Sequence, residues 1–374
     1  MGKRVILAVA GAGKTYRICE NIDLNGSNLI IAYTHENVKN IIKGIKDFYG
    51  NTPNNVSVLT FDAFVYRFMV NPYLPSICSF FDEKSFVSGG ITIQAPPPQT
   101  IKKNGVVIHN RAYVKKEFFN HYHDKSNRLY NEYLPDLLLS VRKRGVNLIK
   151  DICKNLNSFY NHVLVDEFQD FREDRYKLIV EMSKHLNDIL LVGDYYQHSV
   201  SGTNNTGVPF KKGGSVVDYD DFIVELKSIG FDVDNTTLSK SRRCSKDVSN
   251  FIERKFRINF SSHDDHTGFV KVLSDNEEIL SVLNDDKIIK LLYENSSKYS
   301  FKAMNWSYSK GDTFDDVCVI LSKPVDEVVE DKFAGVFDSI VTKNKLYVAF
   351  TRPRRNLYII NSDKFKNVEI LYQK

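Results

Sequence analysis

Short apolar runs rich in β-branched residues alternate along the chain with longer segments in which apolar residues recur every three or four positions. The short runs predict buried strands, and the longer periodicity predicts amphipathic helices. Strands alternating with helices predict an α/β fold with parallel sheets, whose ligand sites lie at the carboxyl ends of the strands. The expected strands are 5–9, 29–33, 56–60, 163–165 and 189–192, followed by 269–273, 317–321 and 357–360.

The alternation is lost between residues 72 and 161. This stretch contains Gly89-Gly90 and the run Pro96–Pro98, followed by aromatic and basic segments of helical length. Glycine and proline interrupt regular elements, so we expect a mainly helical insertion at 72–161. The pattern then predicts a first domain formed by 1–71 plus 162–234, and a second domain at 235–374.

Composition narrows the class of protein only a little. The chain has 374 residues and a net charge of +5, which permits a nucleic-acid partner without requiring one. Its five cysteines have no short spacing, so we expect reduced thiols in a cytoplasmic protein and no disulfide framework or zinc site. No apolar stretch is long enough to cross a membrane, and no membrane association is expected. Basic clusters that could follow a phosphate backbone are Lys102-Lys103, Lys115-Lys116, Arg142-Lys-Arg144 and Lys211-Lys212.

The segment Ala8-Val-Ala-Gly-Ala-Gly-Lys-Thr15 fits the phosphate-binding loop pattern and stands between an expected strand and an expected helix. Gly11 and Gly13 would let the backbone bend around phosphate oxygens. Lys14 would bridge the outer phosphates, and the hydroxyl of Thr15 would bind Mg²⁺. The segment therefore predicts a site for a nucleoside triphosphate with magnesium.

Two further strand ends supply the groups that such a loop needs. Val165-Asp-Glu-Phe-Gln-Asp170 offers Asp166 for magnesium and Glu167 to polarise the attacking water. Leu190-Leu-Val-Gly-Asp-Tyr-Tyr-Gln197 ends in an amide, which can sense the γ-phosphate and the water without competing for the metal.

With these motifs in order, the chain resembles the motor core of superfamily 1 helicases of the UvrD/Rep type. The resemblance covers most of the chain apart from 72–161 and about 255–300. It implies two RecA-like parallel-sheet domains with ATP in the cleft between them. The remaining matching segments are Thr34-His-Glu-Asn37, Leu59-Thr-Phe-Asp-Ala-Phe64, Leu238-Ser-Lys-Ser-Arg-Arg-Cys-Ser245, Ser309-Lys-Gly-Asp-Thr-Phe314 and Leu346-Tyr-Val-Ala-Phe-Thr-Arg352.

The resemblance also implies roles for individual residues. The catalytic residues it implies are Glu167, Gln197, Arg243 and Arg352, with both arginines reaching the γ-phosphate from the second domain. The residues it implies for ATP are Ala10, Gly11, Ala12, Gly13, Lys14, Thr15, Tyr16, Asp166, Arg242, Gly311 and Thr313. The residues it implies for Mg²⁺ are Thr15 and Asp166. The residues it implies for nucleic-acid binding are Thr34, Thr60, Phe61 and Ser309. Phe61 is equally well explained as a stacking face for a base or as a core aromatic residue.

Several positions depart from the family pattern. Arg242 stands where the family has a tyrosine that stacks on adenine, and Thr313 replaces a glutamate, as in the RecD-like branch. Residues 198–205 offer no aromatic that would stack on single-stranded bases. The first strand begins near Met1, so we expect no adenine-reading glutamine before it. About 65 residues separate Cys244 from Ser309, too few for the family's large second-domain insertion. We therefore expect a minimal motor without an appended nuclease.

The sequence predicts an ATPase that translocates on or unwinds nucleic acid, with single-stranded DNA as the favoured track and RNA as the alternative. A different class of function stays open, namely an ATP-dependent switch or regulatory subunit in DNA repair or phage defence. Such a subunit would act with a separately encoded nuclease or repair partner. A small-molecule phosphotransferase would share the phosphate loop but would not explain Gln169, Gln197 or Arg352.

Overall fold

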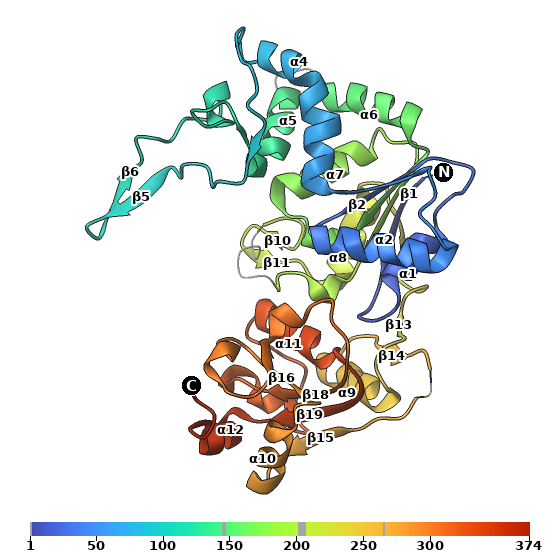
Figure 1. Ribbon diagram of the computed structural model, residues 1–374, viewed down its shortest axis with the longest axis vertical. Helices are drawn as coiled ribbons and strands as arrows, with labels where there is room; N and C mark the ends of the chain where they lie inside the picture. Colours follow the sequence, from blue (N-terminus) through green and yellow to red (C-terminus); the bar gives the residue numbers. More distant parts are fainter. Residues whose placement is uncertain (1, 144–146, 201–206, 265) are drawn as a thin grey trace. The chain divides into compact units, whose positions relative to one another are not determined.

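The computed structural model describes residues 2–143, 147–200, 207–264 and 266–374 (Figure 1). Arg144 of the third basic cluster and residues 201–206 of the loop after Gln197 lie outside the described residues. By their internal contacts the residues form two units, which we call unit 1 (1–3, 21–166 and 171–190) and unit 2 (4–20, 167–170 and 191–374). These units group the phosphate-loop segment with 235–374, so they do not follow the domain bounds expected from the sequence, which stay a prediction.

The strands of the first sheet lie in the order β12-β1-β9-β8-β2-β3. In unit 1, β2 pairs in parallel with both β3 and β8. In unit 2, β1 pairs in parallel with β12. All five strands expected in the first part of the chain are present, which confirms the α/β class. Their bounds are β1 Lys3–Leu7, β2 Asn28–Ala32, β3 Val56–Thr60, β8 His162–Asp166, β9 Ile189–Gly193 and β12 Asp232–Asp234.

Helices in unit 1 begin and end where local chemistry dictates. Thr34 caps α2, because its side chain accepts from the Asn37 N–H while the Asn37 side chain accepts from the Thr34 N–H. Gly50 ends that helix in the left-handed conformation at φ +80°. The helices are α2 His35–Tyr49, α3 Phe61–Phe64, α4 Leu74–Ser79, α5 Leu134–Lys143, α6 Leu148–Phe159 and α7 Glu173–Ser183, with a π-helix at Val65–Val70.

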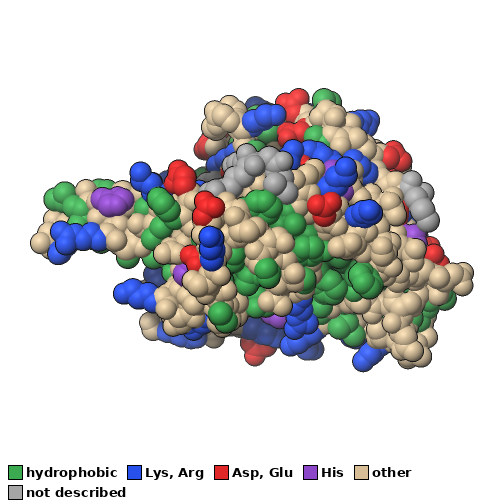
Figure 2. All heavy atoms as spheres, turned by 90° about the horizontal axis from the view of Figure 1, so that it is seen from above, with side chains coloured by type: hydrophobic (Ala, Val, Ile, Leu, Met, Phe, Trp, Pro, Cys, Tyr) green, Lys and Arg blue, Asp and Glu red, His purple; other side chains and the backbone are tan. Residues whose placement is uncertain are grey.

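The stretch 72–161 contains the helices α4, α5 and α6, but also short strands that the sequence did not predict. β4 (Ile91–Thr92) pairs in parallel with β7 (Leu129–Tyr130). β5 (Thr100–Lys103) and β6 (Val106–His109) form an antiparallel hairpin. The hairpin stands away from the helices of its unit, and it forms the projection at the left of Figure 2.

The second sheet lies wholly in unit 2, and its strands are all parallel in the order β15-β19-β18-β16-β17. β16 and β17 were not expected. Lys290 is buried within β16, and its ammonium donates to the carbonyl of Asp285. Because this charged residue interrupts the apolar run, the sequence pattern does not predict the strand. The strands are β15 Val270–Leu273, β16 Ile289–Leu292, β17 Ala303–Asn305, β18 Phe314–Ile320 and β19 Pro353–Ile360.

Unit 2 also holds the helices that cover this sheet and those that follow the first sheet's strands. The helices are α1 Lys14–Glu20, α8 Tyr219–Ser228, α9 Lys246–Phe256, α10 Asn276–Asn284, α11 Ile340–Phe350 and α12 Ser362–Glu369. Short strand pairs are β10 (Lys211–Lys212) with β11 (Ser215–Val216) and β13 (Lys240–Ser241) with β14 (Ser261–Ser262).

One hydrophobic cluster joins the second sheet to α10 and α12, with Leu273, Ile279, Ile320 and Phe365 among its members. All five cysteines are buried free thiols, as expected. Among the described residues, no helix is long and apolar enough to span a membrane.

We expect Trp306→Ala to lower the free energy of unfolding by about 3–5 kcal/mol, because it empties a large core site. Trp306 is 0% exposed, and its indole N–H donates to the carbonyl of Leu291 at 3.0 Å. Tyr308 lies two residues further on and is 73% exposed, so Tyr308→Ala should change stability by no more than about 0.5 kcal/mol. Urea denaturation followed by circular dichroism measures both. Equal losses in the two variants would contradict this account of the core.

Candidate nucleotide-binding site

The phosphate loop joins β1 to α1 within unit 2, and two glycines give it its shape. Gly11 has φ +73° and Gly13 has φ +93°, which L-residues with a Cβ rarely adopt. At Gly11 a Cβ would lie 2.6 Å from the Cβ of Arg243 and 2.8 Å from the Oγ of Ser241. Glycine is therefore required at position 11 both by backbone conformation and by this close approach.

The start of the loop is held by hydrogen bonds to three other segments of unit 2. The N–H of Ala8 donates to Gly193 O at 2.8 Å, and that of Val9 donates to Leu238 O at 2.9 Å. The N–H of Ala10 donates to the hydroxyl of Tyr347 at 2.9 Å. Ala12 is buried, and its N–H donates a hydrogen bond to Val9 O. The N–H groups at the start of α1 have no partner within the helix, which suits them to bind phosphate oxygens.

Glu167 lies against the loop lysine. Its carboxylate is 3.3 Å from Lys14 Nζ and 3.8 Å from Lys310 Nζ, and it accepts a hydrogen bond from Gln169. Burial alone raises the pKa of Glu167, but the two ammonium groups and the Gln169 amide outweigh burial and lower the pKa to about 2. Glu167 is thus ionised throughout the neutral range, as a group that accepts a proton from water must be.

Lys310 is a residue that the sequence did not assign to the site, although it lies inside the quoted Ser309–Phe314 motif. Its ammonium lies 2.7 and 2.8 Å from the two carboxylate oxygens of Asp170. Burial alone lowers the pKa of Lys310, yet Asp170 and Glu167 together raise it. Lys310 therefore stays charged and holds the carboxylates of Glu167 and Asp170, both of which lie in unit 2.

Asp194, at the end of β9, joins several of these groups and was also missed. Its N–H donates to Gln169 Oε1 at 3.0 Å, and its carboxylate accepts from Gln197 Nε2 at 2.8 Å. The hydroxyl of Tyr347 lies 3.4 Å from the same carboxylate. Burial raises the pKa of Asp194 to about 6. Gln197 thus faces Asp194, and Tyr347 connects that carboxylate to the phosphate loop.

Gly193 makes this arrangement possible. A Cβ at Gly193 would lie 2.4 Å from Gln169 Oε1 and 2.5 Å from the Phe168 ring. The Gly-Asp turn therefore allows the Glu167–Asp170 segment to reach the end of β9.

The two predicted arginine fingers differ in what they contact. Arg352 is buried and donates four hydrogen bonds, to Val348 O, Ser309 O, Asp312 O and the Thr351 hydroxyl. Arg243 is half-buried beside Gly11 and donates to Thr351 O at 3.1 Å. Burial, followed by the neighbouring charge of Arg243, lowers the pKa of Arg352 to about 9. In the part of the chain that the structure describes, neither guanidinium forms an ion pair with a carboxylate.

The other residues expected at the nucleotide lie around the loop or on exposed turns of unit 2. Arg242 is exposed, its N–H donates to Gly11 O, and its side chain lies beside Gly13 together with that of Tyr16. Gly311, at φ +95°, and Thr313 lie on an exposed turn. Arg242 and Tyr16 therefore offer two flat groups next to the phosphate loop.

The donor types fit a magnesium ion. Thr15, in the first turn of α1 in unit 2, offers a hydroxyl, and Asp166, buried at the end of β8 in unit 1, offers a carboxylate. Mg²⁺ takes oxygen ligands and usually binds one or two carboxylates while keeping several waters. The described residues contain no cluster of three or more His, Cys, Asp or Glu side chains that would hold a metal without a nucleotide.

The residues expected to contact nucleic acid have mixed environments. Thr34 is exposed, whereas Thr60 is buried and caps α3 by accepting from the Ala63 N–H at 3.2 Å. Phe61 is 1% exposed and packs on Phe171 with ring centroids 5.0 Å apart, which favours its explanation as a core residue. Ser309 is buried, and its hydroxyl donates to Trp306 O. Buried side chains such as Phe61 and Ser309 offer no surface to a strand of bases.

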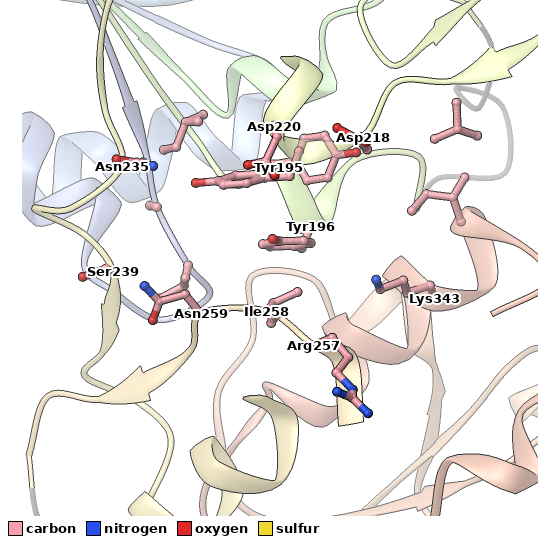
Figure 3. Close-up of a pocket in the computed structure, with 16 residues that line it drawn as sticks. Tyr195, Tyr196, Asp218, Asp220, Asn235, Ser239, Arg257, Ile258, Asn259 and Lys343 are labelled. Carbon is pink, nitrogen blue, oxygen red and sulfur yellow. The ribbon is translucent and has the colours of Figure 1, made fainter. Parts of the chain in front are cut away.

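A separate cavity of about 530 Å³ lies against β1 in unit 2 (Figure 3). Tyr196 and Lys343 line it together with the backbone of residues 7–9. None of the residues predicted to bind the nucleotide lines this cavity, so it is distinct from the site described above.

Comparison with known proteins adds a family match. Residues 94–199 match the family model described as the UvrD/REP helicase N-terminal domain. The expectation that 72–161 stands outside the resemblance is therefore wrong for residues 94–161. Residues 94–133 form mainly loops and short elements, whose sequences vary more among homologues than those of long helices and strands. The comparison with curated proteins found no match.

Among solved structures, the chain is similar to arterivirus nonstructural protein 10 (helicase), with 12% identity and a TM-score of 0.47, over 99% of this chain and 62% of that one. The DNA complex of arterivirus nonstructural protein 10 gives 13% identity and a TM-score of 0.45, over 96% and 60%. The PRRSV helicase gives 14% identity and a TM-score of 0.43, over 99% and 54%. The chain thus spans less than two thirds of each of these proteins.

We expect ATP to stabilise the protein against heat and Gly11→Ala to abolish that stabilisation, because the new Cβ collides with Arg243 and strains the loop. Gly50→Ala is the matched control, since Gly50 also has a positive φ but has open space around the position of a Cβ. Both variants should lose stability through strain, by about 1–2 kcal/mol at Gly50. Only Gly11→Ala should lose the ATP-dependent rise in Tm. An unchanged rise in Gly11→Ala would refute the site.

Proposed function

We propose that this chain, which carries a superfamily 1 helicase core of the UvrD/Rep type, is an ATP-hydrolysing motor that moves on nucleic acid. One observation carries the proposal. Arg243 lies beside Gly11 of the phosphate loop, the charge of Arg352 interacts with that of Arg243, and neither guanidinium forms an ion pair with a carboxylate among the described residues. Buried charges need a partner, and the γ-phosphate of ATP would supply the missing negative charge.

In this proposal the two arginines have different roles. Among the described residues, the Arg243 guanidinium donates one hydrogen bond, to Thr351 O. Its other N–H groups are therefore available to phosphate. Arg352 is held by three carbonyls and a hydroxyl, so it acts chiefly by fixing the Thr351 segment against which Arg243 rests. An arginine at the γ-phosphate neutralises charge that develops during phosphoryl transfer.

Glu167 changes partner when ATP binds. The Lys14 ammonium lies 3.3 Å from its carboxylate. The β- and γ-phosphates attract Lys14, which leaves Glu167 free to accept a proton from the attacking water while Lys310 keeps it ionised. Gln197 positions that water from its place beside Asp194. Thr15 and Asp166 would hold Mg²⁺, which supplies charge neutralisation on the phosphates when bound.

The domains, the other nucleotide contacts and the nucleic-acid contact in this proposal are among those predicted from the sequence. Domains at 1–71 plus 162–234 and at 235–374 open and close around the nucleotide, with 72–161 as a subdomain of the first. Tyr16 and Arg242 hold the base, while Ala10–Gly13, Gly311 and Thr313 complete the nucleotide site. Single-stranded DNA is the proposed track, and Thr34, which is exposed, is the proposed contact.

A second candidate is an ATP-dependent switch that controls a separately encoded nuclease or repair partner without unwinding. The burial of Thr60, Phe61 and Ser309 favours it, because three of the four expected nucleic-acid contacts then offer little surface. The two functions differ in whether nucleic acid stimulates ATP turnover.

The deciding measurement is steady-state ATP hydrolysis with magnesium, titrated with single-stranded DNA and separately with single-stranded RNA. We expect stimulation by single-stranded DNA. Glu167→Gln should keep ATP binding but lower kcat at least about 100-fold, while Lys14→Ala should lose binding. A flat response above real basal turnover supports the switch instead. Absence of turnover in the unmodified protein, or full turnover in Glu167→Gln, overturns the proposed chemistry.

A second prediction concerns pH. Lys310 lowers the pKa of Glu167, so in Lys310→Met the carboxylate takes up a proton at a higher pH. Because protonated Glu167 cannot accept a proton from water, kcat should fall toward acid pH in this variant while the unmodified protein stays active. A pH profile from about pH 5 to about pH 9 measures the shift. Lys310→Arg keeps the positive charge and should keep the original profile. Superimposable profiles for Lys310→Met and the unmodified protein would contradict this role.

A further inference from the structure

The β5–β6 hairpin of unit 1 is a well-formed element that the nucleotide site does not use. Its strands pair over four positions, Thr100 with His109 through Lys103 with Val106. Asn104 and Gly105 connect them with φ +51° and +79°, the two positive values of a type I′ turn. The sequence therefore specifies this hairpin locally, with the turn residues that it requires.

The hairpin is fully exposed. All eight strand residues are exposed, and Val106 and Val107 at its end are 61% and 60% exposed. A two-stranded hairpin alone is at best marginally stable in water. Ile101 and Ile108 are exposed next to Val106 and Val107, and neighbouring exposed aliphatic side chains of this kind mark a contact surface. These features indicate that a partner covers the hairpin when the protein works.

The charge around the hairpin indicates the kind of partner. Residues 84–116 contain no Asp or Glu, whereas six basic residues lie there, namely Lys84, Lys102, Lys103, Arg111, Lys115 and Lys116. Lys116 pairs with Asp136. Within the described parts of the chain, Lys102, Lys103 and Arg111 have no carboxylate partner. A positively charged projection without internal compensation fits a polyanion.

The two lysines are arranged to contact two sides of such a partner. Residues directly opposite in an antiparallel pair share a face, and neighbours along a strand point to opposite faces. Lys103 therefore shares one face with Val106, and Lys102 shares the other with Val107. Each face of the hairpin end thus combines one ammonium group with one aliphatic side chain.

We propose that the β5–β6 hairpin is an arm that binds double-stranded nucleic acid, with Lys102 and Lys103 on the phosphates and the aliphatic end in a groove. A two-stranded ribbon fits the major groove of B-form DNA, which is about 12 Å wide. Single-stranded binding depends on aromatic side chains for base stacking, and residues 99–110 contain no Phe, Tyr or Trp. The arm extends the proposed function, because a motor that moves on one strand meets duplex ahead of it.

The test is binding of a blunt duplex of about 20 base pairs, measured by fluorescence anisotropy across a range of salt concentrations. The variant is Lys102→Glu/Lys103→Glu. The control, Lys323→Glu/Lys364→Glu, makes the same change in net charge at exposed positions elsewhere. We expect the arm variant to weaken duplex binding at least about tenfold and to reduce the salt slope by about 2, with the control unchanged. Binding of a dT oligonucleotide should stay within about twofold in both variants.

Other outcomes overturn the arm. An unchanged duplex affinity and salt slope in the arm variant would contradict the proposal. An equal loss of duplex affinity in the control variant would contradict it as well. Equal losses for duplex and dT would place the hairpin on the single-strand track. If sedimentation shows a dimer that the arm variant abolishes, the hairpin binds a second copy of the chain. Binding needs no ATP turnover, so failure of the proposed ATPase and failure of the arm are separate results.

Discussion

The nucleotide site depends on the close approach of the phosphate loop to the Ser241–Arg243 segment. Gly11 meets Arg243 and Ser241 at a distance that leaves no space for a Cβ, and the N–H of Arg242 donates to Gly11 O. This contact places one guanidinium beside the loop and another flat cationic group beside Gly13. A larger residue at Gly11 would separate the two segments, so the site exists only while this contact holds.

Charge explains why the site should be sensitive to a nucleotide. Lys14 and Lys310 hold the carboxylate of Glu167, and Arg243 lies beside Gly11. Neither Arg243 nor Arg352 forms an ion pair with a carboxylate among the described residues, so the arginine pair gains most from a bound anion. Binding of phosphate would compete with Glu167 for Lys14, which ties activation of the water-directing carboxylate to the arrival of substrate.

A chain of hydrogen bonds connects this chemistry to α11. Tyr347 on α11 accepts from the Ala10 N–H and lies next to Asp194, which in turn bonds Gln169 and Gln197. Arg352 follows the same helix and fixes the Ser309–Asp312 turn. In the proposed function, a change at the γ-phosphate would therefore reach the loop, the end of β9 and α11 through direct contacts. A motor and a switch would both use this connection, and they differ only in what it drives.

The sequence alone determined the elements whose signals are local. Apolar runs gave the strands of the first sheet, Gly11 and Gly13 marked the phosphate loop, and Asp166, Glu167 and Gln197 followed strand ends. The sequence could not show β16, because a buried lysine interrupts its apolar run. The hairpin at 100–109 does have a local signal in its Asn104-Gly105 turn, although its strands are exposed and lack the apolar pattern of a buried strand.

Tertiary structure alone decided which of these groups meet. The contacts of Lys310 with Asp170, of Tyr347 with Ala10 and of Gln169 with Asp194 join residues up to 337 positions apart. It also settled the burial of Phe61 and Ser309, which the family motifs alone would place at nucleic acid. Motif spacing records which residue types are present, whereas distance, burial and the pKa of a carboxylate depend on neighbours that only the fold brings together.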